Sequence, residues 1–289
     1  IVGVATAICA GGPGALFWMV IAALFGMATK YSEGLLAIKY RVIEPDGHVL
    51  GGPFYYIEHG MGKKWKWLAK LFAFFGVCVG LLGLGTFTQI NGISSAVNNF
   101  FDPNMSNTVK IFGMEYSWTV IITGIIVTVC TGLVIIGGIK RISTVSEFVV
   151  PFMAILYVTV CVIILIVNIK AIPAAFGEII AGAFGFKAAA GGMLGAMVLA
   201  MQKGVARGIF SNEAGLGSAP IAAAAAQTKE PARQGLVTMT GTFIDTVVIC
   251  TMTGLCIVIT GAWRPELALE GVGVTTCLLY TSDAADDLI

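Results

Sequence analysis

Long apolar stretches are the feature that most limits how this chain can fold. A helix needs about 20 apolar residues to cross a bilayer. Only helices and closed barrels can satisfy their backbone polar groups inside it. Such stretches recur along the 289 residues, at 15–28 with a weaker continuation to 38, 67–97, 118–139, 145–169, 193–226 and 236–263. They predict an all-α, polytopic membrane protein with about six crossings.

The composition agrees with a membrane protein and excludes several function classes. Hydrophobic residues make up 57% of the chain and charged residues 11%, against about 25% charged residues in soluble domains. The net charge of +1 leaves no basic surface for nucleic acid. The seven cysteines show no CxxC spacing, and His48 and His59 lie in predicted loops. We therefore expect neither a metal site nor a disulfide framework.

The two ends of the sequence do not look like the ends of a domain. Ile1 is not a Met and lies inside an apolar segment, so we expect a fragment of a longer protein. At the other end, residues 277–289 bring three Asp after an ordinary loop. We interpret them as a non-native tail, read through from a sequencing adapter, and leave them out of the fold prediction.

The loops differ in positive charge. If the first partial segment ends outside, the inner loops are 39–66, 140–142 and 228–234. These and the adjoining helix ends hold nine basic residues, namely Lys39, Arg41, Lys63, Lys64, Lys66, Lys140, Arg141, Lys229 and Arg233. The outer loops hold four, namely Lys110, Lys170, Lys187 and Arg264. This is the bias that the positive-inside rule predicts.

The stretch GIFSNEAGLGSAP, at 208–220, places polar residues and glycines inside an apolar run. Ser and Asn favour the first, non-helical position before a helix, and Gly tolerates most backbone conformations. We therefore predict half-helices at 193–207 and 213–226, separated by Gly208 and the pair Ser211 and Asn212. Unpaired backbone must face protein or water in a membrane, so the break predicts a cavity.

The predicted break suits an anionic ligand. A half-helix that starts near Ser211 directs free N–H groups and its positive dipole end at the cavity, where a carboxylate can bind. The alternative is a helix kinked by glycine, in which Glu213 pairs structurally with Lys203 or Arg207. The sequence leaves both open.

Asp245 lies near the centre of the last apolar run, beside Thr242 and Thr246. A lone ionisable group at that depth is costly unless it is paired or hydrated, so its default interpretation is functional. A carboxylate with neighbouring hydroxyls offers oxygen ligands for a small cation. The alternative role is a structural hydrogen-bond centre.

Other polar groups also lie at membrane depth. Thr86, Gln89 and Asn91 either hold helices together or line a cavity, and we expect Gln89 to line one. Lys30 and Glu33 lie toward the inner half of their helix and act either as a gate or as snorkelling side chains.

Several long motifs, in this order, carry a family resemblance: GVATAICAGGPGALFWMV, GMATKYSEGLLAIKYR, GGPFYYIEHGMGKKWKWLA, GVARGIFSNEAGLGSAPIAAAAA and RQGLVTMTGTFIDT. Residues 1–276 resemble the alanine or glycine:cation symporter family and are expected to form one partial transporter domain. The resemblance implies the leucine-transporter fold of inverted repeats, here about helices 1b to 7. The sequence departs from the family at Ala223, where His is common, and at Gly85-Thr86, where relatives favour Asn. Of the family's Gly-Thr-Gly-Asn-Ile motif only Ile1 is present, so the sodium site is incomplete in this sequence.

The resemblance also implies a function. It predicts a multi-pass protein of the plasma (inner) membrane that carries a small neutral amino acid, alanine or glycine, together with Na⁺ by alternating access, with no cofactor besides the coupling ion. The expected substrate-binding residues are Gln89, Gly208, Ile209, Phe210, Ser211 and Asn212, and those of the cation region are Thr242, Asp245 and Thr246.

Other functions remain as alternatives. The first is a proton-coupled symporter of the same fold, in which Asp245 or Glu213 changes protonation. An enzyme is not expected, because neither His lies in a spanning segment to serve as a catalytic base. A channel would not need an interrupted helix that closes around its ligand, and a structural subunit would not need the polar break.

Overall fold

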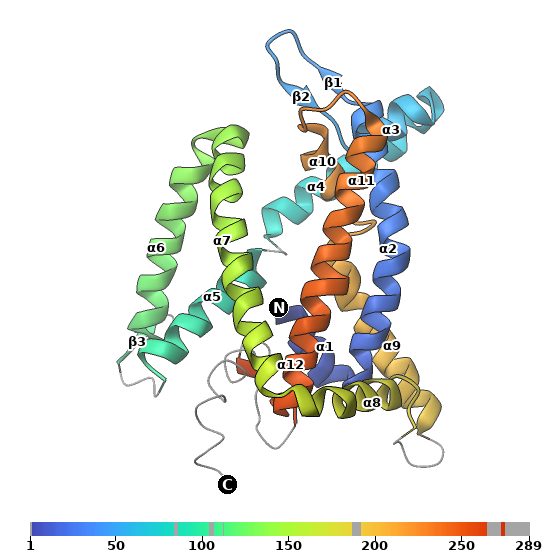
Figure 1. The fold of residues 1–289 in the computed structure, drawn as a ribbon. Helices are drawn as coiled ribbons and strands as arrows, with labels where there is room; N and C mark the ends of the chain where they lie inside the picture. Colours follow the sequence, from blue (N-terminus) through green and yellow to red (C-terminus); the bar gives the residue numbers. More distant parts are fainter. Residues whose placement is uncertain are drawn as a thin grey trace.

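Helices form almost all of the regular structure in the computed structural model, which describes residues 2–83, 86–103, 107–111, 113–186, 192–264 and 273–274 (Figure 1). The elements in chain order are α1 (Val2–Gly11), α2 (Gly14–Lys39), β1 (Val42–Ile43), β2 (Val49–Leu50), α3 (Pro53–Gly60), η1 (Lys63–Trp65), α4 (Lys66–Leu82), α5 (Thr86–Phe101), β3 (Thr108–Ile111), β4 (Met114–Ser117), α6 (Trp118–Ile135), α7 (Gly138–Val167), η2 (Ile169–Ala171), α8 (Ile172–Ala183), α9 (Met193–Asn212), α10 (Ala219–Ala224), α11 (Pro231–Thr242), the π-helical segment η3 (Phe243–Cys250) and α12 (Thr251–Thr260). The strands form two short antiparallel hairpins in loops, β1 with β2 and β3 with β4. The predicted non-native tail at 277–289 lies outside the described residues.

Five helical stretches in the described part of the chain are long and apolar enough to cross a membrane. They are Gly14–Lys39, Lys63–Phe101, Trp118–Ile135, Arg141–Val167 and Pro231–Thr260. Each overlaps one of the six predicted runs, which confirms a helical, polytopic membrane protein. The sixth run, 193–226, is divided between α9 and α10.

The basic loops lie together at one end of the molecule. Figure 1 shows α3, the β1–β2 hairpin, α10 and the turn between α6 and α7 at the upper end, and α8 and the β3–β4 hairpin at the lower end. The predicted inner loops are the connections at the upper end, which we call the basic end. Because the three loops share one end, the alternation predicted from the basic residues is consistent with the structure.

Helix α2 is central to the packed helices and contacts α1, α8, α9 and α11. Buried side chains such as Ile8, Met19 and Ile257 join α1, α2 and α12 in one core cluster. Helices in a bilayer are held together by close van der Waals packing and not by exclusion from water. Gly204 allows such an approach between α9 and α2, because a Cβ atom there would collide with the carbonyl oxygen of Ala15.

The interruption of the sixth run confirms a broken helix but corrects its place. Helix α9 continues through the predicted break and ends at Asn212, and the chain leaves the helix at Glu213, which has a φ of 55°. Gly208 lies inside the helix and packs closely against α2, since a Cβ atom there would lie 3.1 Å from the Met19 side chain. The Asn212 side chain accepts a hydrogen bond from the N–H of Ala214 at 3.0 Å. Asn212 therefore stabilises the turn after the helix and does not start a new one.

Candidate functional site

A cavity of about 320 Å³ lies where α9 ends beside α11 and η3; we call it the break cavity. Its lining residues are Lys30, Ser211, Asn212, Glu213, Thr238, Gly241, Thr242 and Asp245. Four of the predicted site residues, Ser211, Asn212, Thr242 and Asp245, therefore come together at one place. The structure joins the two polar stretches that the sequence singled out separately.

Asp245 is the centre of the hydrogen bonds at this site. Its Oδ2 atom accepts a hydrogen bond from the Ser211 hydroxyl at 2.8 Å and another from the Thr246 hydroxyl at 2.9 Å. The Asn212 amide nitrogen donates to the Thr246 hydroxyl oxygen at 3.2 Å, and Thr246 is fully buried. These contacts tie the last turn of α9 to η3, so the two elements hold the carboxylate in a fixed position.

Asp245 and Thr246 belong to the π-helical segment η3, between α11 and α12. A π-helix contains an extra residue in its turn, and such segments inside α-helices occur frequently at functional sites. The extra residue also rotates the side chains that follow it relative to those before it. In this position, η3 brings Asp245 to the end of α9.

Two features of the break cavity favour a cation. The hydroxyl oxygen of Thr242 is buried, and it has no hydrogen-bond partner among the described residues. The last carbonyl groups of α9 are at the negative end of the helix dipole, which attracts positive charge. The structure therefore turns the carbonyl end of a half-helix toward this region, whereas the sequence predicted an N–H end there. Half-helix carbonyl ends are the groups that coordinate Na⁺ in transporters with broken helices.

Buried charges extend from the break cavity toward the basic end. The side chains of Lys30 and Glu33 are more than nine-tenths buried, so neither snorkels to solvent. The Oε2 atom of Glu33 has no hydrogen-bond partner in the described part of the chain, although the backbones of Gly215 and Gly217 lie beside the carboxylate. Burial, and then the negative charge of Glu33, raises the pKa of Tyr56 on α3 to about 12, so its hydroxyl stays protonated at neutral pH.

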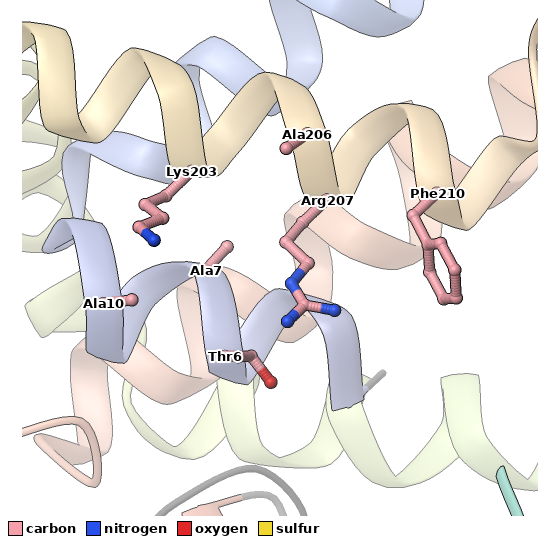
Figure 2. Close-up of a pocket in the computed structure, with 7 residues that line it drawn as sticks. All are labelled: Thr6, Ala7, Ala10, Lys203, Ala206, Arg207 and Phe210. Atoms are coloured by element: carbon pink, nitrogen blue, oxygen red, sulfur yellow. The ribbon is translucent and has the colours of Figure 1, made fainter. Parts of the chain in front are cut away.

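A second cavity, of about 330 Å³, lies between α1 and α9; we call it the α1–α9 cavity (Figure 2). Its lining residues are Thr6, Ala7, Ala10, Lys203, Ala206, Arg207 and Phe210. Phe210, predicted to bind substrate, lines this cavity and not the break cavity. The predicted alternative pairing of Glu213 with Lys203 or Arg207 does not occur, since no ion pair of the described residues includes either cation.

The remaining predicted site residues do not reach either cavity. Gly208 packs against Met19 of α2, and Ile209 is half-buried on α9. Gln89 is exposed on α5, so the structure does not support the expectation that it lines a cavity with the α9 residues.

Sequence reasoning did not assign Lys30 or Thr238 to the site. Lys30 could be recognised as unusual, because it is a charged residue inside an apolar helix. The sequence did not indicate which other helix it faces, so it could not be assigned to the break cavity. Thr238 had no such signal: its hydroxyl donates to the backbone oxygen of Lys30 at 2.9 Å, a contact between residues 208 positions apart.

The sequence is similar to one known family of proteins along nearly its whole length. The sequence pattern of the sodium:alanine symporter family matches residues 1–282. An uncharacterized transporter of Haemophilus influenzae is 58% identical over 93% of this chain and 56% of its own length. The sodium/alanine symporter AgcS of Methanococcus maripaludis is 48% identical over 90% of this chain and 54% of its own length.

A further relative has a different substrate in its name. The probable sodium/glutamine symporter GlnT of Bacillus subtilis is 40% identical over 96% of this chain and 54% of its own length. The chain thus spans about half the length of the curated relatives that it matches.

Proposed function

The chain belongs to the sodium:alanine symporter family, a family of transporters, and on that premise we propose that it forms part of a Na⁺-coupled symporter for a small neutral amino acid, alanine or glycine. The observation that carries the proposal is the meeting of the α9 break with the Asp245 carboxylate in one cavity. We assign the protein to the plasma (inner) membrane, with its basic end in the cytoplasm, as the positive-inside rule favours.

The proposed mechanism is alternating access in a leucine-transporter-like fold of inverted repeats. Carriers of this kind bind substrate and ion at interrupted helices near the middle of the membrane and then open to the other side. The interruption at Glu213 provides such a place, because the chain leaves the α-helical conformation there with a φ of 55°. If substrate and ion both favour the closed state, each raises the affinity of the protein for the other.

The cation role is assigned to Thr242, Asp245 and Thr246. Asp245 supplies negative charge, and Thr242 supplies a buried hydroxyl oxygen with no partner among the described residues. Thr246 contributes by holding the carboxylate through its 2.9 Å hydrogen bond. Together with the carbonyl end of α9, these oxygens form a partial coordination shell for Na⁺.

The substrate role is assigned to Ser211 and Asn212, which line the break cavity beside the cation region. The cavity contains one buried cation, Lys30, and the carboxylates of Asp245 and Glu213. Charges of both signs in one cavity suit a zwitterion, whose carboxylate and ammonium groups need different partners. At about 320 Å³ the cavity falls at the lower end of the usual range for small-molecule sites. We therefore favour a small side chain on the substrate.

The coupling ion is tested by uptake. The full-length gene product, reconstituted in liposomes, is expected to accumulate labelled alanine when an inward Na⁺ gradient is imposed. An inward proton gradient alone is expected to give no accumulation. Accumulation driven by protons alone would replace the proposal with a proton-coupled symporter in which Asp245 or Glu213 carries the proton.

The substrate class is tested in the same liposomes by measuring labelled glutamine in parallel with labelled alanine. Uptake of glutamine without uptake of alanine would reject a small neutral amino acid as the substrate.

Thr242→Val separates a ligand role from a structural one. Valine has nearly the same shape but lacks the hydroxyl. Removing a buried, unpaired hydroxyl is expected to relieve a penalty of about 1–3 kcal/mol and raise the midpoint of thermal unfolding in detergent. Because the same oxygen is proposed to contact Na⁺, the Na⁺ concentration for half-maximal uptake is expected to rise about tenfold.

Thr251→Val is the matched control for this variant. The Thr251 hydroxyl on α12 is also buried and unpaired in the described part of the chain, but Thr251 does not line the break cavity. Its removal is expected to stabilise the protein without changing Na⁺ activation. If Thr242→Val raises stability and leaves Na⁺ activation unchanged, Thr242 is not a ligand.

A further inference from the structure

We propose that the α1–α9 cavity is a second anion site, which holds the carboxylate of an amino acid before the molecule reaches the break cavity. The inference rests on the proposed function, because it takes an amino acid as the transported molecule. The two cavities share no lining residue.

The first support is unpaired positive charge. Lys203 and Arg207 are four residues apart on α9, a spacing at which like charges repel each other. Both side chains extend from α9 toward α1 (Figure 2). No acidic residue lines the cavity, and neither cation forms an ion pair with a described residue. An anion in the cavity would offset the repulsion between Lys203 and Arg207 and would give each of the two side chains an oppositely charged partner.

The second support is depth. At 1.5 Å per residue, Lys203 lies about 15 Å and Arg207 about 21 Å along α9 from Met193. Both side chains therefore lie away from the Met193 end of α9, inside the apolar run at 193–226. Charged groups at such depth face the interior of a bundle or a water-filled hollow and mark pathways for ions or substrates. A cavity of about 330 Å³ provides that hollow.

The third support is the chemistry of the lining. A planar guanidinium such as that of Arg207 forms two parallel hydrogen bonds with one carboxylate, and Lys203 adds a point charge. Three alanines, Ala7, Ala10 and Ala206, line the same cavity and leave room beside the cations. The cavity offers no carboxylate to an ammonium group. It therefore recognises the carboxylate of the amino acid, whereas the break cavity offers partners for both charges.

Thiol labelling tests the site directly in the full-length gene product. Ala10 is exposed and lines the cavity, so Ala10→Cys, in a Cys9→Ser background, is expected to react with an anionic methanethiosulfonate reagent. Propionate, a carboxylate without an ammonium group, is expected to slow this labelling. Arg207→Gln is expected to abolish the protection, and Lys170→Gln, which changes an exposed cation between α7 and α8, is expected to keep it. The background without Ala10→Cys gives the labelling of the other cysteines.

Transport supplies a second readout that does not need the introduced cysteine. In Na⁺-driven uptake, Arg207→Gln is expected to raise the KM for alanine about tenfold or more, as for the loss of a charge-assisted hydrogen bond. The maximal rate is expected to stay within about twofold. Propionate is expected to inhibit uptake by the parent protein and to lose this effect in Arg207→Gln. Arg207→Lys keeps the positive charge but loses the planar guanidinium, so this variant is expected to have an alanine affinity between those of Arg207→Gln and the parent protein.

The outcomes separate this inference from the proposed function. Labelling that is indifferent to propionate, in a protein that transports alanine, overturns the anion site and leaves the symporter. Protection by propionate in a protein that does not transport alanine keeps the site and rejects the proposed function. If chloride protects as well as propionate does, the cavity binds inorganic anions and the assignment to a carboxylate is overturned.

Discussion

Asp245→Asn is expected to raise the Na⁺ concentration for half-maximal alanine uptake by about tenfold to a hundredfold, since hydrogen bonds and contacts to charged groups are worth about 1.5–3 kcal/mol. The amide keeps the shape of the side chain and one acceptor oxygen. It loses the negative charge, and its NH₂ group cannot accept the hydrogen bonds that Ser211 and Thr246 now donate to Oδ2. Uptake at saturating Na⁺ is expected to fall much less than Na⁺ affinity.

Glu147→Gln is the matched control for this change. Glu147 is an exposed carboxylate on α7, far along the chain from α9 and η3, so its neutralisation is expected to leave Na⁺ activation unaltered. Both variants are measured as alanine uptake against external Na⁺ at constant ionic strength. Equal Na⁺ activation curves for Asp245→Asn and the parent protein would leave Asp245 as a structural hydrogen-bond centre. Loss of proton-driven uptake in this variant would instead favour the proton-coupled alternative.

The spanning helices, and the position of the basic loops at one shared end, could be predicted because both depend on local physical rules. A helix must contain about 20 apolar residues to cross the membrane, and these residues are contiguous in the sequence. Basic residues mark the inner loops one loop at a time. Asp245 could also be found from the sequence, since one carboxylate inside an apolar run is costly wherever the run packs.

The position of the helix break could not be predicted, because residues that often end helices have other uses here. Gly208 packs closely against Met19, and the Asn212 side chain caps the turn that begins at Glu213. The contact of Gly208 with Met19 is not visible without the neighbouring helix, and an Asn can cap the turn after one helix as well as begin the next. The error matters chemically, since it replaces the predicted N–H end of a half-helix with a carbonyl end. The preference at this point changes from an anion to a cation.

Other features depend on which helix lies beside which. Gln89 is polar and at membrane depth, as a cavity residue would be, but it lies on α5 outside the two cavities described, so its role stays a prediction. Segment η3 is only eight residues long, which is too short for the pattern of apolar residues to distinguish a π-helix from an α-helix. The rotation that brings Asp245 to Ser211 was therefore not predicted. Local chemistry therefore identified candidates, and tertiary packing decided which of them meet.

Gly204→Ala is expected to destabilise the protein by about 1–3 kcal/mol, the usual cost of inserting a methyl group into a packed interface. The added Cβ would collide with the backbone carbonyl oxygen of Ala15 and crowd the Cβ atom of Trp18. A backbone atom cannot move aside like a flexible side chain, so α9 must shift away from α2. The expected result is a lower midpoint of thermal unfolding in detergent.

Gly195→Ala is the matched control on the same helix, because a Cβ atom there would meet nothing within 4 Å. Alanine favours a helix over glycine by about 1 kcal/mol, so this variant is expected to be as stable as the parent protein or more stable. Since α9 lines both cavities, the shift caused by Gly204→Ala is also expected to weaken alanine and Na⁺ affinity together, although Gly204 lines neither cavity. If Gly204→Ala were as stable as Gly195→Ala, the close packing of α9 on α2 would not hold the two cavities in place.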